Sequence, residues 1–243
     1  MSKGLVVCTY NRPNYLRRCL ESIKDLDIET IVVVMDGGSP SEKENYRIIN
    51  EYGILNDIVL EKNQGIGAVK NAGIQLLLEL GCEHIFTLEE DNIITDPLTL
   101  NKYIEYAQEK GLYHLNFGLH GTLNTGRGKW VDWKGTSVWV YPDLVGSFSY
   151  YHKKAIEEVG LIDEQFYNAM EHVEHTWRIA EAELTTPFWW FADHPESGSM
   201  IQEIEGSLHN STIRNRPDFR ELIKEGYKKF IEKHQRPFPR RDR

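Results

Sequence analysis

The chain of 243 residues contains little cysteine and no long apolar run. Its cysteines, Cys8, Cys19 and Cys82, are scattered and none has CxxC spacing, so they predict no disulfide framework. No apolar stretch approaches the roughly 18 residues that span a bilayer. The N-terminus carries no secretory hydrophobic region. We therefore expect a globular, cytoplasmic protein without stable membrane insertion.

Positive charge is also scarce in this sequence. The 28 Lys and Arg residues face 37 Asp and Glu residues, a formal net charge of −9. This balance argues against a general binder of duplex DNA or of membrane surfaces, because both need a cationic footprint. Hydrophobic residues make up 40% of the chain, which is enough for one sizeable domain or for two lobes that share a core. We expect an enzyme.

The order of apolar patterns predicts an α/β fold. Short apolar runs alternate with helical periodicity in the first half, which is typical of a single Rossmann-like, mostly parallel sheet flanked by helices. The strands are expected at residues 4–9, 30–35, 57–61 and 84–88. The second half has glycines, aromatics and short alternating runs, and indicates a smaller mixed α+β lobe. We therefore divide one compact domain into halves at residues 1–115 and 116–243.

Polar residues follow each early strand. They are Thr9, Tyr10, Asn11 and Arg12 after the first, Asp36 after the second, Asn63 after the third, and Glu89, Glu90 and Asp91 after the fourth. The carboxyl ends of parallel strands form the usual ligand cleft of an open α/β sheet. Asn, Asp and Gly also form turns, so any one of these ends has a plain structural explanation. Together they indicate a single cleft.

The glycine loop around Gly65 and Gly67 lacks two nucleotide-binding signatures. Lys70 stands where a dinucleotide fingerprint needs its third glycine, and the sequence contains no GxxxxGK[ST] motif. The loop is better suited to bring backbone close to a phosphate at a helix N-terminus, with Lys70 adding positive charge.

The acidic run Glu89-Glu90-Asp91 directly follows an apolar strand. Oxygen ligands with open positions suit Mg²⁺ or Mn²⁺ that also holds a diphosphate. A solvated acidic turn is the alternative. We favour a divalent metal because the run follows a buried strand and faces the predicted cleft.

Several segments together resemble a family-two glycosyltransferase with the GT-A fold. TYNRPNYLRRCLES is similar to the opening strand, loop and helix of that family, VVVMDGGS to its VVDDGS, NQGIGAVKNAGI to its NxGxxxARNxG, and LEEDN to its Asp-x-Asp metal motif. The resemblance implies a nucleotide site with Asp36 at the uracil base. It implies these nucleotide-binding residues: Thr9, Tyr10, Asn11, Arg12, Asp36, Asn63, Gly65, Gly67, Lys70, Asn71 and Glu90.

The second half resembles the chondroitin-polymerase and galactosyltransferase-like branch of this family. NAMEHVEHTWR is similar to its WGGEDVEFxYR segment, and SLHNS offers His209 as a metal ligand beside Glu89 and Asp91. The resemblance places Glu171 and His172 at the catalytic position and Glu174 at the acceptor. His172 stands where inverting members have an aspartate base, and retaining relatives also lack an acid there, so the stereochemical outcome stays open.

Aromatic residues suggest further acceptor contacts. Trp130 and Trp133 lie in a glycine-containing segment that we interpret as a loop near the cleft, where their rings would stack on a sugar. Burial of these rings as packing is the alternative. The face formed by Glu171, Glu174, His175 and Arg178 would equally suit a solvated helix.

The function expected from these features is metal-dependent transfer of a sugar, with inversion, from a UDP-hexose or UDP-HexNAc to an acceptor hydroxyl. The acceptor is a saccharide, a protein or a modified nucleobase. Two rival functions are a sugar nucleotidyltransferase and a non-catalytic nucleotide- or glycan-binding module. The first would need a glycine-rich loop after the first strand, where this chain has TYNRPN.

Overall fold

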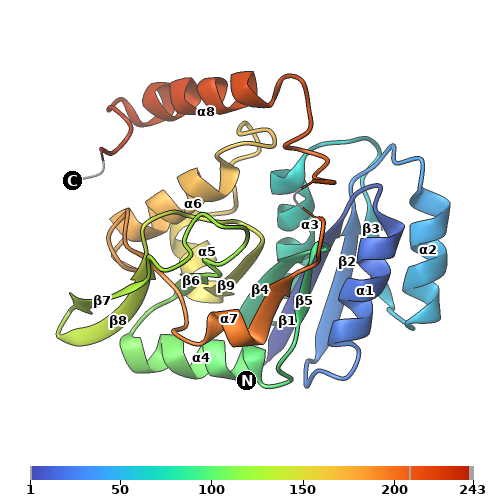
Figure 1. Ribbon diagram of the computed structural model, residues 1–243, viewed down its shortest axis with the longest axis horizontal. Helices are drawn as coiled ribbons and strands as arrows, with labels where there is room; N and C mark the ends of the chain where they lie inside the picture. Colours follow the sequence, from blue (N-terminus) through green and yellow to red (C-terminus); the bar gives the residue numbers. More distant parts are fainter. Residues whose placement is uncertain (1, 208, 241–243) are drawn as a thin grey trace.

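A mixed six-stranded sheet organises the computed structural model, which describes residues 2–207 and 209–240 (Figure 1). Its strand order is β3-β2-β1-β4-β9-β6. The first four strands are parallel, and β9 runs antiparallel between β4 and β6. The strands are β1 (Lys3–Thr9), β2 (Thr30–Met35), β3 (Asn56–Val59), β4 (His84–Glu89), β6 (His114–Asn116) and β9 (Phe148–His152). The predicted α/β class with a mainly parallel sheet is confirmed.

Helices cover both faces of this sheet. The helices are α1 (Pro13–Ile23), α2 (Glu42–Glu51), α3 (Ile66–Glu79), α4 (Thr99–Lys110), α5 (Lys153–Val159), α6 (Glu171–Glu181), α7 (Ser197–Met200) and α8 (Phe219–His234). Alternate residues of β1 enter two separate cores: Leu5 and Val7 pack with α1, α2 and α4, while Val6 and Cys8 pack with α3, α5 and α6. This alternation is the expected consequence of the two-residue period of a strand.

Local sequence explains the helices closest to the site. Pro13 occupies the first turn of α1, where its missing N–H needs no partner. On α3, Gly73 permits close packing on the sheet, because a Cβ there would lie 2.3 Å from Cγ1 of Val6. Both helices follow parallel strands, α1 after β1 and α3 after β3, so each begins beside the carboxyl ends of those strands.

Two small sheets complete the fold. One has the order β10-β8-β7, with β7 at Lys129–Trp133, β8 at Thr136–Tyr141 and β10 at Phe191–Ala192. The other pairs β5 (Asn92–Ile94) with β11 (Ile201–Glu203) in antiparallel register. This pairing places β11, from late in the chain, beside the segment that directly follows β4. Within the described part of the chain, no helix is both long and apolar enough to cross a bilayer.

The sheet crosses the predicted boundary at residue 115. Strand β9 belongs to the second half of the chain, yet it pairs with β4 of the first half over five residues. The predicted change of architecture therefore occurs inside one sheet. In Figure 1 the helix α8, coloured red, runs above α6 at the upper left of the view, and the small β7–β8 hairpin lies at the lower left.

A group of buried histidines packs on β4, β6 and α6. His84 contacts the hydroxyl of Tyr150 at 2.9 Å, and His114 stacks on Tyr151 with ring centroids 4.4 Å apart. Burial lowers the pKa of His84 and of His114 to about 4, and also lowers the pKa of His175 well below its ordinary value. Each ring is therefore held neutral in the folded protein.

These histidines predict a loss of stability in mild acid. Below pH 6.5 the imidazole of His114 takes up a proton in the unfolded chain, but in the folded chain only near pH 4, so unfolding binds protons between these values. The free energy of unfolding should lose roughly 3 kcal/mol through this group across that interval, at about 1.4 kcal/mol per pKa unit. Urea unfolding of His114→Gln from pH 4 to 7 should show a shallower pH dependence than the wild type. His209→Gln, which changes an exposed histidine, should keep the wild-type slope; a His114→Gln slope equal to wild type would contradict the assignment.

Candidate active site

A cavity of about 350 Å³ lies at the carboxyl ends of β1, β2 and β4. We call it the strand-end cavity. Of the residues predicted to bind a nucleotide, six line it: Thr9, Tyr10, Arg12, Asp36, Asn63 and Glu90. The wall residues that the sequence argument missed include Tyr167 and Arg216, whose guanidinium carbon lies 5.5 Å from the Tyr167 ring centroid. Both come from late loops without a periodic pattern.

Asp36 organises the glycine loop at the edge of this cavity. Its carboxylate accepts hydrogen bonds from the backbone N–H of Gln64 at 2.7 Å and of Gly65 at 3.0 Å. Gly65 has φ of 87°, a conformation that favours glycine. Burial raises the pKa of Asp36, and the backbone N–H groups oppose that rise. These hydrogen bonds therefore fix the position of the loop from which α3 begins.

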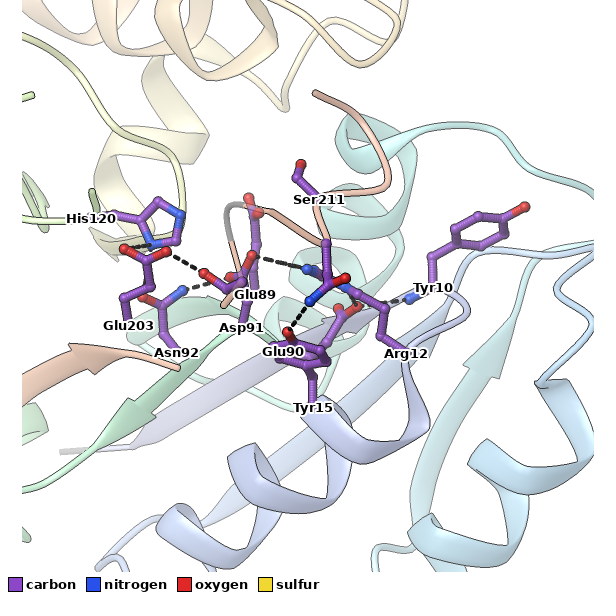
Figure 2. A network of polar contacts seen from close by, with 12 residues as sticks. Tyr10, Arg12, Tyr15, Glu89, Glu90, Asp91, Asn92, His120, Glu203 and Ser211 are labelled. Atoms are coloured by element: carbon purple, nitrogen blue, oxygen red, sulfur yellow. Dashed lines mark hydrogen bonds and ion pairs between the residues drawn. The ribbon is translucent and has the colours of Figure 1, made fainter. Parts of the chain in front are cut away.

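Arg12 lies at the centre of the acidic run, as Figure 2 shows. Its Nε donates to Oε1 of Glu90 at 2.8 Å, and both terminal nitrogens lie 3.3 Å from Oδ2 of Asp91. The guanidinium also sits 5.1 Å from the ring centroid of Tyr15. Asn92 donates to Oδ1 of Asp91 at 2.8 Å. Arg12 and Glu90, which were both predicted to contact a nucleotide, are therefore bound to each other in this structure.

Burial changes the protonation of this run. It raises the pKa of Glu90 to about 7, although Arg12 opposes the change. Burial and the neighbouring Glu89 raise the pKa of Asp91, again against Arg12. An added cation would therefore be favoured here, because it would stabilise the charged carboxylates.

Lys70 of α3 pairs with Glu89, the acid of the run that Arg12 does not contact. Its side chain is buried, and its Nζ donates to Oε1 of Glu89 at 2.9 Å and to the carbonyl of Gly146 at 2.7 Å. Burial alone would lower the pKa of Lys70, but Glu89 and Glu171 reverse this and raise it. Lys70 is therefore a fixed positive charge between two acidic groups.

A second cavity, of about 460 Å³, adjoins the first. We call it the dyad cavity after two of its residues, Glu171 and His172. Oε1 of Glu171 lies 2.9 Å from Nδ1 of His172. Burial would raise the pKa of Glu171, but His172 and Lys70 outweigh it and lower the pKa to about 2. A Cβ on Gly146 would lie 2.8 Å from Cγ of His172, so this glycine makes room for the imidazole.

Another histidine of the dyad cavity was missed by the sequence argument. His120 also lines the cavity, with Nδ1 3.2 Å from Oδ1 of Asn92. Glu203 of β11 lies 4.0 Å from the same nitrogen (Figure 2). Its carboxylate also accepts from the backbone N–H of Gly121. His120 follows the short strand β6 and belongs to no recognisable motif. The pairing of β5 with β11 places Asn92 opposite Glu203, and the N–H of Gly121 ties the loop of His120 to Glu203.

Three predicted nucleotide-binding residues have structural partners outside the strand-end cavity. Asn71 donates to the carbonyl of Ile162 and to Glu164, both at 2.8 Å. Asn11 accepts from the Ser41 hydroxyl at 2.9 Å. Gly67 faces Glu171, whose Cβ would be 3.6 Å from an added Cβ. They position α1 and α3 around the two cavities.

The structure does not bring the predicted acceptor residues to either cavity. Trp130 and Trp133 lie on strand β7, in register with Trp139 and Thr136 of β8, so the predicted loop at these residues is a hairpin strand. Alternation of side chains along this paired strand gives the two rings opposite faces. Glu174 is fully buried under α8 and pairs with Arg178, Lys233 and His234.

The three predicted metal ligands are also separated. Glu89 and Asp91 both line the dyad cavity, whereas His209 is exposed in a different hollow beside Glu203 and Gly206. Among residues 2–207 and 209–240, no three His, Cys, Asp or Glu side chains are close enough to hold a metal ion. Two carboxylates nevertheless fit a hard divalent cation, because Mg²⁺ is commonly held by one or two carboxylates together with substrate phosphates.

Comparisons with known proteins identify the family and the fold of the chain. The model of the family described as glycosyl transferase family 2 matches residues 5–160. Over 77 residues the chain is 36% identical to EpsH of Bacillus subtilis (strain 168), whose name describes it as a glycosyltransferase. That match covers 30% of this chain and 22% of EpsH.

Solved glycosyltransferases share the fold at low sequence identity. S. aureus TarS residues 1–349 align with a TM-score of 0.61 and 15% identity, covering 95% of this chain and 66% of TarS. GalNAc-T7 with UDP, GalNAc and Mn²⁺ aligns with a TM-score of 0.65 and 13% identity, covering 96% of this chain and 48% of that one. The chain thus spans only part of the proteins that it matches. Its fold is GT-A.

The pairing of Arg12 predicts a large effect on stability. Arg12→Met would leave the buried carboxylates of Glu90 and Asp91 without their cation, which typically costs about 3–5 kcal/mol of unfolding free energy. Urea unfolding at pH 8 measures this loss. Arg17→Met is the matched control. It breaks the ion pair between Arg17 and Glu51, whose two side chains are each 40% exposed, and should change stability little. Equal stability of the two variants would contradict a buried role for Arg12.

Proposed function

The chain belongs to glycosyl transferase family 2, whose model matches residues 5–160, and from that membership we propose that it transfers a sugar from a UDP-sugar to an acceptor hydroxyl. One observation carries the proposal. The strand-end cavity and the dyad cavity share part of their walls: Ile66, Glu89, Asn168 and Ile213 line both. A donor in the first and an acceptor in the second would therefore meet beside Glu89.

The strand-end cavity suits the nucleotide. Tyr10, Asp36 and Asn63 line it, and Asp36 keeps free lone pairs after accepting two backbone hydrogen bonds, because an ionised carboxylate offers about four acceptor sites. One of these would receive the imide N–H of uracil. TarS has been solved with UDP and with UDP-GlcNAc, which makes a UDP-sugar the first donor to test, whereas PcManGT from Pyrobaculum calidifontis was solved with GDP-Man and Mn²⁺.

Glu89 and Asp91 are the residues that would hold a divalent metal. When bound, Mn²⁺ or Mg²⁺ supplies electrostatic stabilisation of the leaving diphosphate. Arg12 and Lys70 hold the two carboxylates in position through ion pairs. These cations also add positive charge near the leaving group, where negative charge develops as the anomeric C–O bond breaks.

His172 is the proposed general base and Glu171 its positioning residue. With Nδ1–H of His172 donating to Glu171 at 2.9 Å, the neutral ring has its lone pair on Nε2. Nε2 takes the proton of the acceptor hydroxyl while that oxygen forms a bond to the anomeric carbon. The bond from this carbon to the diphosphate oxygen breaks, and its electrons leave with the diphosphate. Attack from the face opposite to the leaving group inverts the centre.

The metal assignment predicts the effect of Asp91→Asn. The substitution removes a charged oxygen ligand, so release of UDP from a UDP-sugar should fall roughly 100-fold or more. Calorimetry should show weaker Mn²⁺ binding by the same variant. Asp132→Asn changes an exposed carboxylate on β7 and should match the wild type in both assays. Wild-type turnover and Mn²⁺ affinity in Asp91→Asn would contradict the assignment. Binding of UDP-sugars by the wild type without turnover would indicate a non-catalytic module.

The base assignment predicts a slower transfer step in His172→Ala. Loss of a general base typically reduces the rate by about 10²–10⁴-fold. Glu171→Gln should reduce it less, because the imidazole remains. Turnover at saturating donor measures both effects, and NMR identifies the product anomer. Near-normal turnover in His172→Ala, or a product with the configuration of the donor, would overturn the base and the inversion; a larger loss in Glu171→Gln would make Glu171 the base.

A further inference from the structure

The dyad cavity combines a polar end with apolar walls. Its polar side chains include Glu89, Asp91 and the Glu171–His172 pair. Much of the remaining wall is apolar and comes from two separate parts of the chain. The loops around β7 and β8 provide Leu123, Leu144 and Val145, and α8 provides Phe219, Ile223 and Tyr227. Sugar hydroxyls would pair with the polar side chains and would leave this apolar surface without a partner.

Helix α8 presents one face to this cavity. Phe219, Ile223 and Tyr227 recur every four residues, so they lie above one another on the helix. Large apolar surface remains uncovered at the cavity: Tyr227 is 41% exposed and Leu123 is 51% exposed. Both residues line the cavity that also contains the proposed base. This apolar surface is therefore continuous with the proposed reaction site.

The packing of α8 holds this face in position. Gly226 lies in the interior of the helix, where glycine is normally unfavourable. A Cβ there would lie 2.7 Å from Cγ of Met170, so the glycine allows α8 to approach the start of α6. Farther along, Phe230 packs edge-on against Trp177, with ring centroids 5.0 Å apart. Lys233 also donates to the buried Glu174 at 2.9 Å. The wall is therefore part of the fold.

We propose that the acceptor carries an alkyl chain beside its reacting hydroxyl, and that this chain lies against Ile223 and the other apolar residues of the dyad cavity. The inference rests on the proposed function, because it assigns the acceptor to the cavity of Glu171 and His172. An alkyl group fits because Leu123, Leu144 and Val145 from the loops and Ile223 from α8 are aliphatic. Its burial would remove water from those side chains.

A homologous series of ligands tests this proposal without requiring turnover. The dissociation constants of methyl, butyl, hexyl and octyl β-D-glucoside would be measured by NMR titration, below micelle concentrations, with UDP and Mn²⁺ present. Each methylene that enters the cavity should tighten binding by roughly fourfold, from the transfer free energy of a buried CH₂. Ile223→Ser should reduce the ratio of methyl to octyl dissociation constants.

Ile231→Ser is the matched control, since Ile231 lies on the same helix, is 45% exposed and is not part of the cavity wall. It should keep the wild-type ratio. Equal dissociation constants for methyl and octyl glucoside would overturn the proposal, as would equal losses in both variants, which would indicate non-specific binding of alkyl chains. Release of UDP from UDP-sugars in the absence of acceptor is measured separately. If that release occurs and the alkyl preference is absent, only the acceptor proposal fails.

Discussion

At the end of β4 three consecutive acidic residues lie against the buried Lys70 and the partly buried Arg12, and the surrounding structure depends on this arrangement. Arg12 comes from the start of α1 and Lys70 from α3, so the ion pairs connect helices on opposite faces of the sheet. Acidic side chains this close together repel one another in a site from which water is excluded. The two cations reduce that repulsion and fix the direction of each carboxylate toward the cavities.

The side-chain amide of Asn168 helps to connect the two cavities. Oδ1 of Asn168 accepts from the backbone N–H of Ile66 at 3.0 Å, at the first residue of α3. Asn168 itself has φ of 52°, in the left-handed region that asparagine tolerates better than most residues. The loop before α6 is thereby held against the glycine loop, and both cavities include residues of each. A shift of the loop on one side would displace the wall of the other.

Most of the central fold was predictable because local signals coincide with the final packing. The apolar run at residues 30–35 is strand β2, and the periodicity after Pro13 is α1. The strands β5 and β11 could not be predicted, because each has three residues and is defined by its partner far along the chain. The hairpin strand β7 was assigned to a loop for a related reason: its alternation is clear only when β8 is paired with it.

The site was predictable by residue type and less so by contact. Strand ends place Asp36, Glu89 and Asp91 at one edge, and the structure brings them to adjoining cavities. The pairing of Arg12 with two of the acids is a long-range contact that no spacing encodes. His209 belongs to the segment SLHNS, whose resemblance to the family implied a third metal ligand, but it lines another hollow.

The pairing of β5 with β11 has a consequence for the order in which the protein is completed on the ribosome. The backbone N–H of Ile204 donates to the carbonyl of Asp91 at 2.7 Å. Strands β1 to β4 emerge early and can begin to assemble, since N-terminal parts generally fold first during synthesis. The acidic run receives its last backbone partner only when β11 has left the exit tunnel. Nascent chains would thus carry the parallel strands β1 to β4 before the acidic run is completed.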